Sequence, residues 1–239
     1  MYVLGIESSC DETSAAIVRM DEGRRDICAN IVASQIDTHR LYGGVVPEIA
    51  SRAHVEAISR ITYEALDTAG LSLSDIGAVA VTTHPGLIGA LLVGVNFAKS
   101  LAFAHDIPLV SVNHIHAHVA AAYLADPDLR PPFLALVVSG GHTSLYCVTS
   151  ETEFEEIGCT RDDAAGEAFD KIGRVIGLPY PGGAALDKLA YEGNPTAFKL
   201  PHPKVEGCPW DFSFSGLKTF VINTIHRCEQ KGESYSVPD

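Results

Sequence analysis

The chain has few basic residues for its size, and this shortage limits the partners it can hold by charge. It contains 17 lysines and arginines against 30 aspartates and glutamates in 239 residues, a formal net charge of −13. Such an excess of negative charge opposes unaided, nonspecific binding to a phosphate backbone. A nucleic-acid partner would therefore need a local basic patch or a helper subunit.

Closely spaced cysteines and long apolar runs are also missing. The six cysteines include no C-x-x-C pair, so we expect reduced thiols in a reducing compartment. The first residues lack the basic and apolar segments of a secretory signal, and the most apolar window, 87–104, is interrupted by Asn96 and Lys99. We therefore expect a buried helix at 87–104, no membrane partner and a cytoplasmic protein.

The order of hydrophobic patterns predicts strands first, then alternating helices and strands. Three apolar runs separated by polar turns predict an antiparallel three-stranded meander at 2–8, 14–18 and 27–33. A long helical pattern begins at Pro47 and stops at Gly70. After it we expect a strand at 78–81, a helix through Phe103, a strand at 108–112 and a helix carrying three histidines.

The first hairpin pattern then recurs. Residues 3–18 align without a gap on residues 133–148, and each copy is an apolar strand, a five-residue polar turn and a second apolar strand. Helical patterns follow the second copy at 162–176 and 184–191. Two copies of one α/β unit predict a pseudo-symmetric protein with a ligand cleft between lobes, which we place at 1–112 and 113–239.

Two glycine-rich turns are candidates for nucleotide binding. The small residues of S-G-G-H-T (139–143) would let backbone N–H groups approach a phosphate, although this motif taken alone favours an ordinary tight hairpin. Gly182 and Gly183 precede a helix whose first amides suit an anionic or ribose-bearing ligand, or merely mark a helix start after a proline turn. Their occurrence in a duplicated half favours the nucleotide interpretation.

Acidic residues accompany both halves. Glu167 and Lys171 are spaced to form an ion pair on a helix, and Asp170 could accept hydrogen bonds from a ribose. Asp11 and Glu12 occupy the first hairpin turn and are expected to project toward the second one. Paired carboxylates there indicate a metal, a general base or recognition of an amine, with a capped acidic turn as the alternative.

Three histidines stand at alternate positions in N-H-I-H-A-H. On a helix, His114 and His118 lie about 40° apart on one face, and His116 points to the other side. H-x-x-x-H is a spacing of helical zinc and iron sites, but Ile115 occupies the place of the metalloprotease glutamate. We expect a metal that positions or polarises a ligand, with a third ligand from elsewhere. Histidines that merely cap or cover a helix are the alternative.

Eight motifs, in order along the whole chain, resemble the bacterial TsaD family, whose members were formerly labelled O-sialoglycoprotein endopeptidases. They are G-I-E-S-S-C-D-E-T-S, Y-G-G-V-V-P-E-I-A-S-R-A-H, P-G-L-I-G-A-L-L-V-G, N-H-I-H-A-H, V-S-G-G-H-T, D-D-A-A-G-E-A-F-D-K, Y-P-G-G-A-A-L-D-K-L-A and F-S-F-S-G-L-K-T. The resemblance implies a duplicated, two-lobed α/β fold of the actin/sugar kinase/Hsp70-like (ASKHA, ribonuclease H-like) class. It also implies a tRNA N6-adenosine threonylcarbamoyltransferase, which moves the threonylcarbamoyl group from threonylcarbamoyl-AMP to adenosine 37 of tRNAs that read ANN codons.

The resemblance further implies roles for individual residues. His114 and His118 match the family's histidine ligands to a divalent metal, iron(II) with zinc as the alternative. Positions that match its binding site for the adenine nucleotide (threonylcarbamoyl-AMP, or ATP and AMP) are Val137, Val138, Ser139, Gly140, Gly141, Asp170, Gly183 and Asp187. Positions that match residues needed for activity are Asp11, Glu12 and His142. Expected partners are tRNA, a paralogous TsaB-like subunit and a TsaE-like ATPase.

One departure from the family concerns the C-terminal end. Family members continue past S-Y-S-V-P-D and carry there an aspartate as third protein ligand and an asparagine at the nucleotide. We therefore expect a truncated chain with an incomplete second lobe and an incomplete metal site. Three other functions stay open: a kinase or ATPase on the same fold, which leaves His114 and His118 unused, a metalloprotease, and a non-enzymatic scaffold for a paralogous partner.

Overall fold

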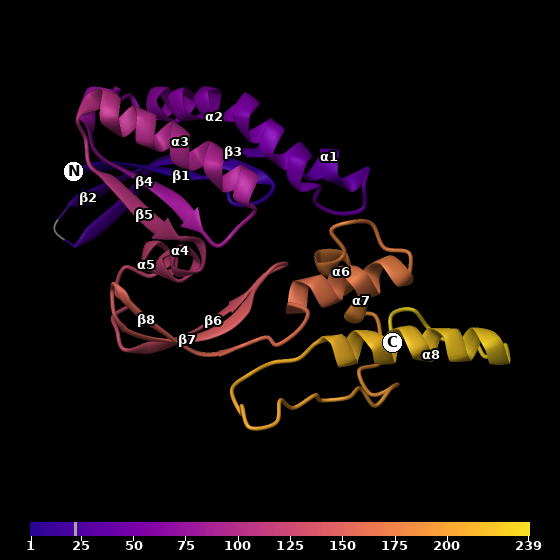
Figure 1. Ribbon diagram of the computed structural model, residues 1–239. Helices are drawn as coiled ribbons and strands as arrows, with labels where there is room; N and C mark the ends of the chain where they lie inside the picture. Colours follow the sequence, from indigo (N-terminus) through magenta and orange to yellow (C-terminus); the bar gives the residue numbers. More distant parts are fainter. Residues whose placement is uncertain (22) are drawn as a thin grey trace. The chain divides into compact units, whose positions relative to one another are not determined.

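The computed structural model describes residues 1–21 and 23–239 and divides into two units, Met1–Leu129 and Arg130–Asp239. The second turn of the predicted meander contains Glu22, which lies outside the described residues. All six cysteines are free thiols, as the sequence predicts. The two units are described separately below (Figure 1).

A five-stranded sheet forms the base of the first unit. Its order is β3-β2-β1-β4-β5, with antiparallel pairing among the first three strands and parallel pairing of β4 with β1 and β5. The strands are β1 (Tyr2–Glu7), β2 (Glu12–Asp21), β3 (Arg24–Ser34), β4 (Ile76–His84) and β5 (Leu109–Asn113). The predicted meander and the two later strands are therefore confirmed.

Two long helices cover one face of this sheet (Figure 1). The helices and helical turns before β5 are α1 (Ile36–Arg40), α2 (Pro47–Ala69), a 3-10 turn η1 (Leu73–Asp75) and α3 (Ile88–His105). Pro47 suits the start of α2 because its missing N–H would have no partner in the first turn, and Gly70 ends the helix with a φ of 66°. Ile58, Ile61 and Ala65 of α2 join the strand residues in one buried core.

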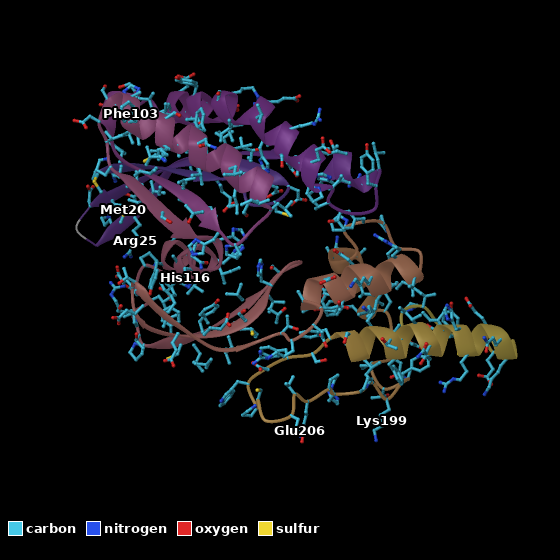
Figure 2. The ribbon with its side chains drawn as sticks, viewed as in Figure 1. Met20, Arg25, Phe103, His116, Lys199 and Glu206 are labelled. Carbon is cyan, nitrogen blue, oxygen red and sulfur yellow. The ribbon has the colours of Figure 1, made fainter. Side chains whose placement is uncertain are left out.

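The third helix departs from the expectation of a fully buried element. One face is buried, including Leu91 and Ala98, but Ile88, Leu92 and Phe103 are 75%, 51% and 90% exposed. Phe103 lies near the C-terminal end of α3 (Figure 2). By length and composition alone α3 could cross a membrane, whereas in the structure it packs against β4 and α2.

The helix with the histidines belongs to the first unit, whereas the sequence placed it in a second lobe beginning at 113. The boundary lies between Leu129 and Arg130. α4 (His114–Ala120) begins directly after β5, and the Asn113 side chain accepts hydrogen bonds from the amides of Ile115 (2.8 Å) and His116 (3.2 Å). This cap ties α4 to the end of a strand of the first sheet, which explains the correction.

The second unit opens with a three-stranded antiparallel sheet that repeats the first hairpin. Its strands, in the order β6-β7-β8, are β6 (Phe133–Val138), β7 (Thr143–Ser150) and β8 (Glu153–Cys159). Leu4 pairs with Ile17 in the first copy, and Leu134 pairs with Cys147 in the second, so both hairpins keep the same register after a shift of 130 residues. The predicted duplication is confirmed for this module.

Helices complete the second unit: α6 (Ala165–Val175), α7 (Gly183–Ala190) and α8 (Ser215–Lys231), while the short α5 (Ala122–Ala125) closes the first. The expected Glu167–Lys171 ion pair is present at 2.7 Å. Lys171 also reaches Asp163, whose other carboxylate oxygen binds Lys218 of α8 at 2.6 Å. These ion pairs join two of the sequence motifs and hold α6 against α8.

Candidate metal and substrate site

The two histidines one turn apart on α4 converge, as the sequence predicts. The Nε2 atoms of His114 and His118 are 3.1 Å apart, and their rings meet edge-on. Two ligands placed about 2.1 Å from one ion at roughly 90–110° stand about 3.0–3.4 Å apart, so this separation suits a shared metal. His116 lies elsewhere on α4 (Figure 2), where burial and the charge of His84 lower its pKa.

Glu7 belongs to this cluster, although sequence reasoning did not single it out. Its Oε2 lies 2.9 Å from His114 Nδ1 and accepts a hydrogen bond from Thr82 Oγ1 at 2.6 Å, and its Oε1 accepts from the amide of Ser9. Burial alone would raise the pKa of Glu7, but the hydrogen bonds from His114, Ser9 and Thr82 outweigh it and hold the pKa at about 2. The sequence carries one signal for Glu7, because it is a charged residue at the end of an apolar strand.

An ionised Glu7 decides which nitrogen of His114 carries the proton. A carboxylate can only accept, so His114 Nδ1 carries the proton and Nε2 keeps its lone pair toward His118. A carboxylate behind a histidine is the usual arrangement around metal-binding imidazoles. The chemistry of this donor set therefore fits a divalent ion.

The protein ligands found here number two. Across residues 1–21 and 23–239, no group of three or more histidine, cysteine, aspartate and glutamate side chains is arranged to hold an ion. Imidazole ligands accept iron(II) and zinc alike. A metal at His114 and His118 would keep its other positions for water, substrate oxygens or ligands beyond the described residues.

The turn with Asp11 and Glu12 follows β1, whose last residue is Glu7. Glu12 is the exposed first residue of β2, and Asp11 is half-buried in the turn before it. On the sheet face opposite α2 and α3, a hollow is lined by small residues of β1 and β2, such as Gly5 and Ser14, and by His114 and His118. The first unit thus brings a carboxylate turn and a histidine pair to the same end of β1, where Glu7 lies.

The glycine turn of the second unit is a tight hairpin with open space around its glycines. It is a tight hairpin, because the Ser139 amide donates to the His142 carbonyl at 2.8 Å and the His142 amide to Ser139 Oγ at 3.1 Å. It is also open, because a Cβ added to Gly140 or Gly141 would meet nothing within 4 Å. A ligand could therefore approach this backbone closely.

Gly166, at the start of α6, was missed by the sequence reasoning and supports this turn. A Cβ there would stand 2.6 Å from the Ser139 carbonyl and 2.8 Å from Gly140 N, while its amide donates to that same carbonyl at 3.1 Å. Only glycine permits so close an approach. Of the two preceding positions, Val137 is 7% exposed and packs in the core, whereas Val138 is 52% exposed.

The second glycine pair differs from its prediction. Asp170 Oδ1 accepts hydrogen bonds from the amides of Gly182 (2.7 Å) and Gly183 (3.3 Å), so the amides expected to bind an anion already have a carboxylate partner. Asp187 lies one turn later on α7 and is exposed. The structure therefore brings Asp170 and Gly183 together, with Asp170 capping α7.

Comparison with solved structures defines the class of fold. A ROK hexokinase from Thermus thermophilus matches with a TM-score of 0.50 at 18% identity, covering 82% of this chain and 71% of that one. YeaZ from Pseudomonas aeruginosa aligns over 99% of this chain and 97% of its own with a TM-score of 0.43 and 16% identity. With its repeated hairpin-led units, the chain has the actin/sugar kinase/Hsp70-like α/β fold.

Comparison of sequences is more specific. Residues 26–235 match the model of the TsaD family, tRNA N6-adenosine threonylcarbamoyltransferase. Proteins of that name from Geobacillus thermodenitrificans and Clostridium botulinum (strain Hall) are 57% and 54% identical over 98% and 99% of this chain, which spans 67% and 69% of their lengths. The chain belongs to the TsaD family.

Proposed function

We propose that this chain carries the metal-binding and nucleotide-binding parts of a transferase that moves the threonylcarbamoyl group from threonylcarbamoyl-AMP to N6 of adenosine 37 in tRNAs reading ANN codons. The observation that carries the proposal is the paired His114 and His118, backed by Glu7, in a chain of this family. The relatives' name supplies the tRNA and the transferred group. Because tRNA is the acceptor, we place the protein in the cytoplasm.

The reaction is an acyl transfer. The N6 amine attacks the carbamoyl carbon of the mixed anhydride, a C–N bond forms, the bond from that carbon to the phosphate oxygen breaks, and AMP leaves with the electron pair. N6 then gives up a proton, for which Asp11, Glu12 and His142 are the candidate acceptors. Holding amine and carbonyl in register can lower the barrier by as much as about 7–11 kcal/mol.

Three sets of residues would make different kinds of contact in this proposal. In the turn after Ser139, Gly140 and Gly141 would present an open backbone edge to the donor's phosphate or carbonyl oxygens. Asp170 would accept from a ribose hydroxyl through Oδ2, because Oδ1 caps α7. The ion at His114 and His118, iron(II) or zinc, would polarise and orient oxygens of the donor.

The net charge and one apolar surface support a role for helper proteins. A net charge of −13 leaves tRNA binding dependent on other proteins, for which we propose a TsaB-like subunit and a TsaE-like ATPase. The exposed side of α2 and α3 offers a docking surface: Val55 is 63% and Leu92 51% exposed beside a hollow that Ser59 and Asn96 also line. A Leu92→Glu variant should lose the TsaB-like subunit in pull-down.

Mass spectrometry of tRNA nucleosides tests the proposal. Because the chain spans 67% of the Geobacillus relative, we would assay it alone and as a chimera that replaces the matching part of that relative. Each is incubated with tRNA, threonylcarbamoyl-AMP and the partner proteins. Threonylcarbamoyladenosine formed by the chimera, and lost in its His118→Ala variant, is the expected result. A folded chimera that leaves adenosine unmodified would overturn the proposal.

The other two enzymatic functions predict different products. A kinase or ATPase would release phosphate from ATP without tRNA or the carbamoyl donor. A metalloprotease needs a general base beside its metal, but Ile115 is buried at 4% exposure, and Glu7 is bonded to His114 Nδ1. The phosphate assay and a glycoprotein cleavage assay on the same samples therefore separate the three.

A further inference from the structure

His54 of α2 lies beneath the acidic turn and is completely buried. Its Nε2 lies 3.0 Å from the Cys10 carbonyl oxygen, and its Nδ1 lies 2.8 Å from Thr13 Oγ1. A carbonyl can only accept, so Nε2 carries the hydrogen and Nδ1 accepts from the Thr13 hydroxyl. Burial lowers the pKa of His54, in agreement with this neutral form. One imidazole thus holds both ends of the turn that contains Asp11 and Glu12.

A second set of contacts joins the turn to the segment before α2. The Gln35 amide donates to the Asp11 carbonyl at 3.0 Å. The Gln35 side chain bonds the Ala50 carbonyl (3.4 Å) and His39 Nε2 (3.1 Å), and His39 Nδ1 accepts from the Val46 amide (3.3 Å). Both Gln35 and His39 are buried, so this network is shielded from water.

The start of α3 blocks movement on another side of the turn. The Leu87 amide donates to the Ser9 carbonyl at 2.8 Å, and Ser8 Oγ donates to the Ala90 carbonyl at 2.9 Å. A Cβ on Gly86 would stand 2.6 Å from the same Ser9 carbonyl. The backbone of residues 8–13 is therefore held by α2, α3 and the segment around Gln35, and its two carboxylates project from a fixed frame.

We propose that His54 is a positioning residue: through the Cys10 carbonyl and the Thr13 hydroxyl it sets the direction in which Asp11 and Glu12 present their carboxylates to the reacting amine. The inference deepens the proposed function and rests on it. A core position filled for packing alone would take an apolar side chain, because burying an imidazole requires partners for both nitrogens. Here both partners belong to the acidic turn.

Three substitutions in the chimera described above separate positioning from packing. His54→Gln keeps an N–H near the place of Nε2 and so keeps the Cys10 contact. His54→Asn keeps an acceptor near Nδ1 but leaves the Cys10 carbonyl unpaired, and His54→Ala removes both contacts. We expect near-normal transfer from the Gln variant and a fall in kcat of about 100-fold for Asn and Ala, with little change in KM for the donor. His105→Asn, at the exposed end of α3, is the control.

Hydrogen exchange at the amides of residues 10–13 gives a second readout that needs no activity. Faster exchange in the Asn variant than in the Gln variant, with zinc binding at His114 and His118 unchanged, supports the proposal. Equal exchange and equal kcat in the two variants would overturn it, even if the Ala variant fails to fold. If the unsubstituted chimera transfers nothing, the proposed function fails, while the exchange comparison still decides whether His54 holds the turn.

Discussion

The turns of the two hairpins differ in how they are held. In the first unit, residues 8–12 carry two carboxylates, and their backbone is bonded by the backbone amide of Gln35 and by the buried imidazole of His54. In the second unit, residues 139–142 include two glycines, and the backbone of Gly166 packs directly on the turn. The strands on either side keep one register in both copies.

This contrast shows how one duplicated module supports two kinds of turn. A turn that presents charge must fix flexible side chains, which requires a network of hydrogen bonds around it. A turn that presents backbone amides needs space, which glycine supplies by having no side chain. The strand register was preserved while the support of each turn diverged, so substitutions should affect the two copies in different ways.

The largest expected effect tests the first unit, whose turn carries the two carboxylates. His118→Ala removes one imidazole and leaves the Glu7–His114 pair in place, so stoichiometric binding of zinc or iron(II) should be lost. Metal content after loading and dialysis, measured by mass spectrometry, checks this outcome. His116→Ala should retain the metal, because His116 lies away from the pair. Full occupancy in the His118→Ala protein would show that the histidines merely cover the helix.

A smaller effect should follow from Glu7→Gln. The amide keeps the size of the side chain but loses the charge that holds the proton on His114 Nδ1, so affinity for zinc should fall by about 10–100-fold. Competition with a fluorescent chelator measures the change. Glu48→Gln, which removes an exposed carboxylate paired with Arg52 on α2, serves as the matched control and should bind like the parent. Identical affinities in all three proteins would remove Glu7 from the site.

The second unit, whose turn contains the two glycines, can be tested with two glycine-to-alanine substitutions. Gly166→Ala places a methyl group against the backbone of Ser139 and Gly140, and overpacking should cost about 1–3 kcal/mol in the free energy of unfolding. That cost exceeds the gain of at most about 1 kcal/mol from helix propensity. Gly140→Ala meets open space and should change stability by less than about 0.5 kcal/mol.

Gly140→Ala should weaken ligand binding more than Gly166→Ala does, the reverse of their order in stability. Gly140→Ala fills the space that a phosphate would enter, so it should weaken binding of an adenine nucleotide while leaving the fold intact. Urea unfolding followed by the fluorescence of Trp210, the single tryptophan, reports on the second unit. If Gly140→Ala destabilised this unit as much as Gly166→Ala, the open edge would be a packing feature and not a binding surface.

Local patterns predicted the strands and helices well because their causes are local. Alternating apolar residues gave the meander, Pro47 and Gly70 gave both ends of α2, and the i, i+4 spacing gave the histidine pair. The boundary between units was misplaced because a strand followed by a helix looks the same inside a unit as between units. The grouping of α4 with the first sheet is visible only in three dimensions.

The residues that were missed act at long range. Glu7 meets His114 across 107 positions, and the periodicity of β1 carries no sign of that contact. Gly166 is needed because of the turn at Ser139, not because of its own helix. The amides of Gly182 and Gly183 were expected to be open, but Asp170 occupies them from the preceding helix. Partners distant in sequence therefore decided the details of both halves.

The smallest effect concerns a carboxylate brace in the second unit. Asp162 accepts hydrogen bonds from the Phe214 and Ser215 amides at 2.7 and 3.1 Å and from the Ser213 and Ser215 hydroxyls, at the start of α8. Burial opposes its ionisation, but these four bonds outweigh burial and lower the pKa of Asp162 to about 2. The brace is therefore charged at neutral pH, like Glu7 in the first unit.

Acid should remove this brace in a defined range. The folded pKa of Asp162 lies below the unfolded value of about 3.9, so its contribution is complete above pH 4 and is lost as the pH falls toward 2. Asp162→Asn should cost about 0.5–2 kcal/mol at pH 7, as removal of a helix cap does, and less at pH 3. Urea titrations of both proteins, read by Trp210 at the two pH values, give the difference. A cost that stays constant with pH would show that the shape of Asp162, and not its charge, holds α8.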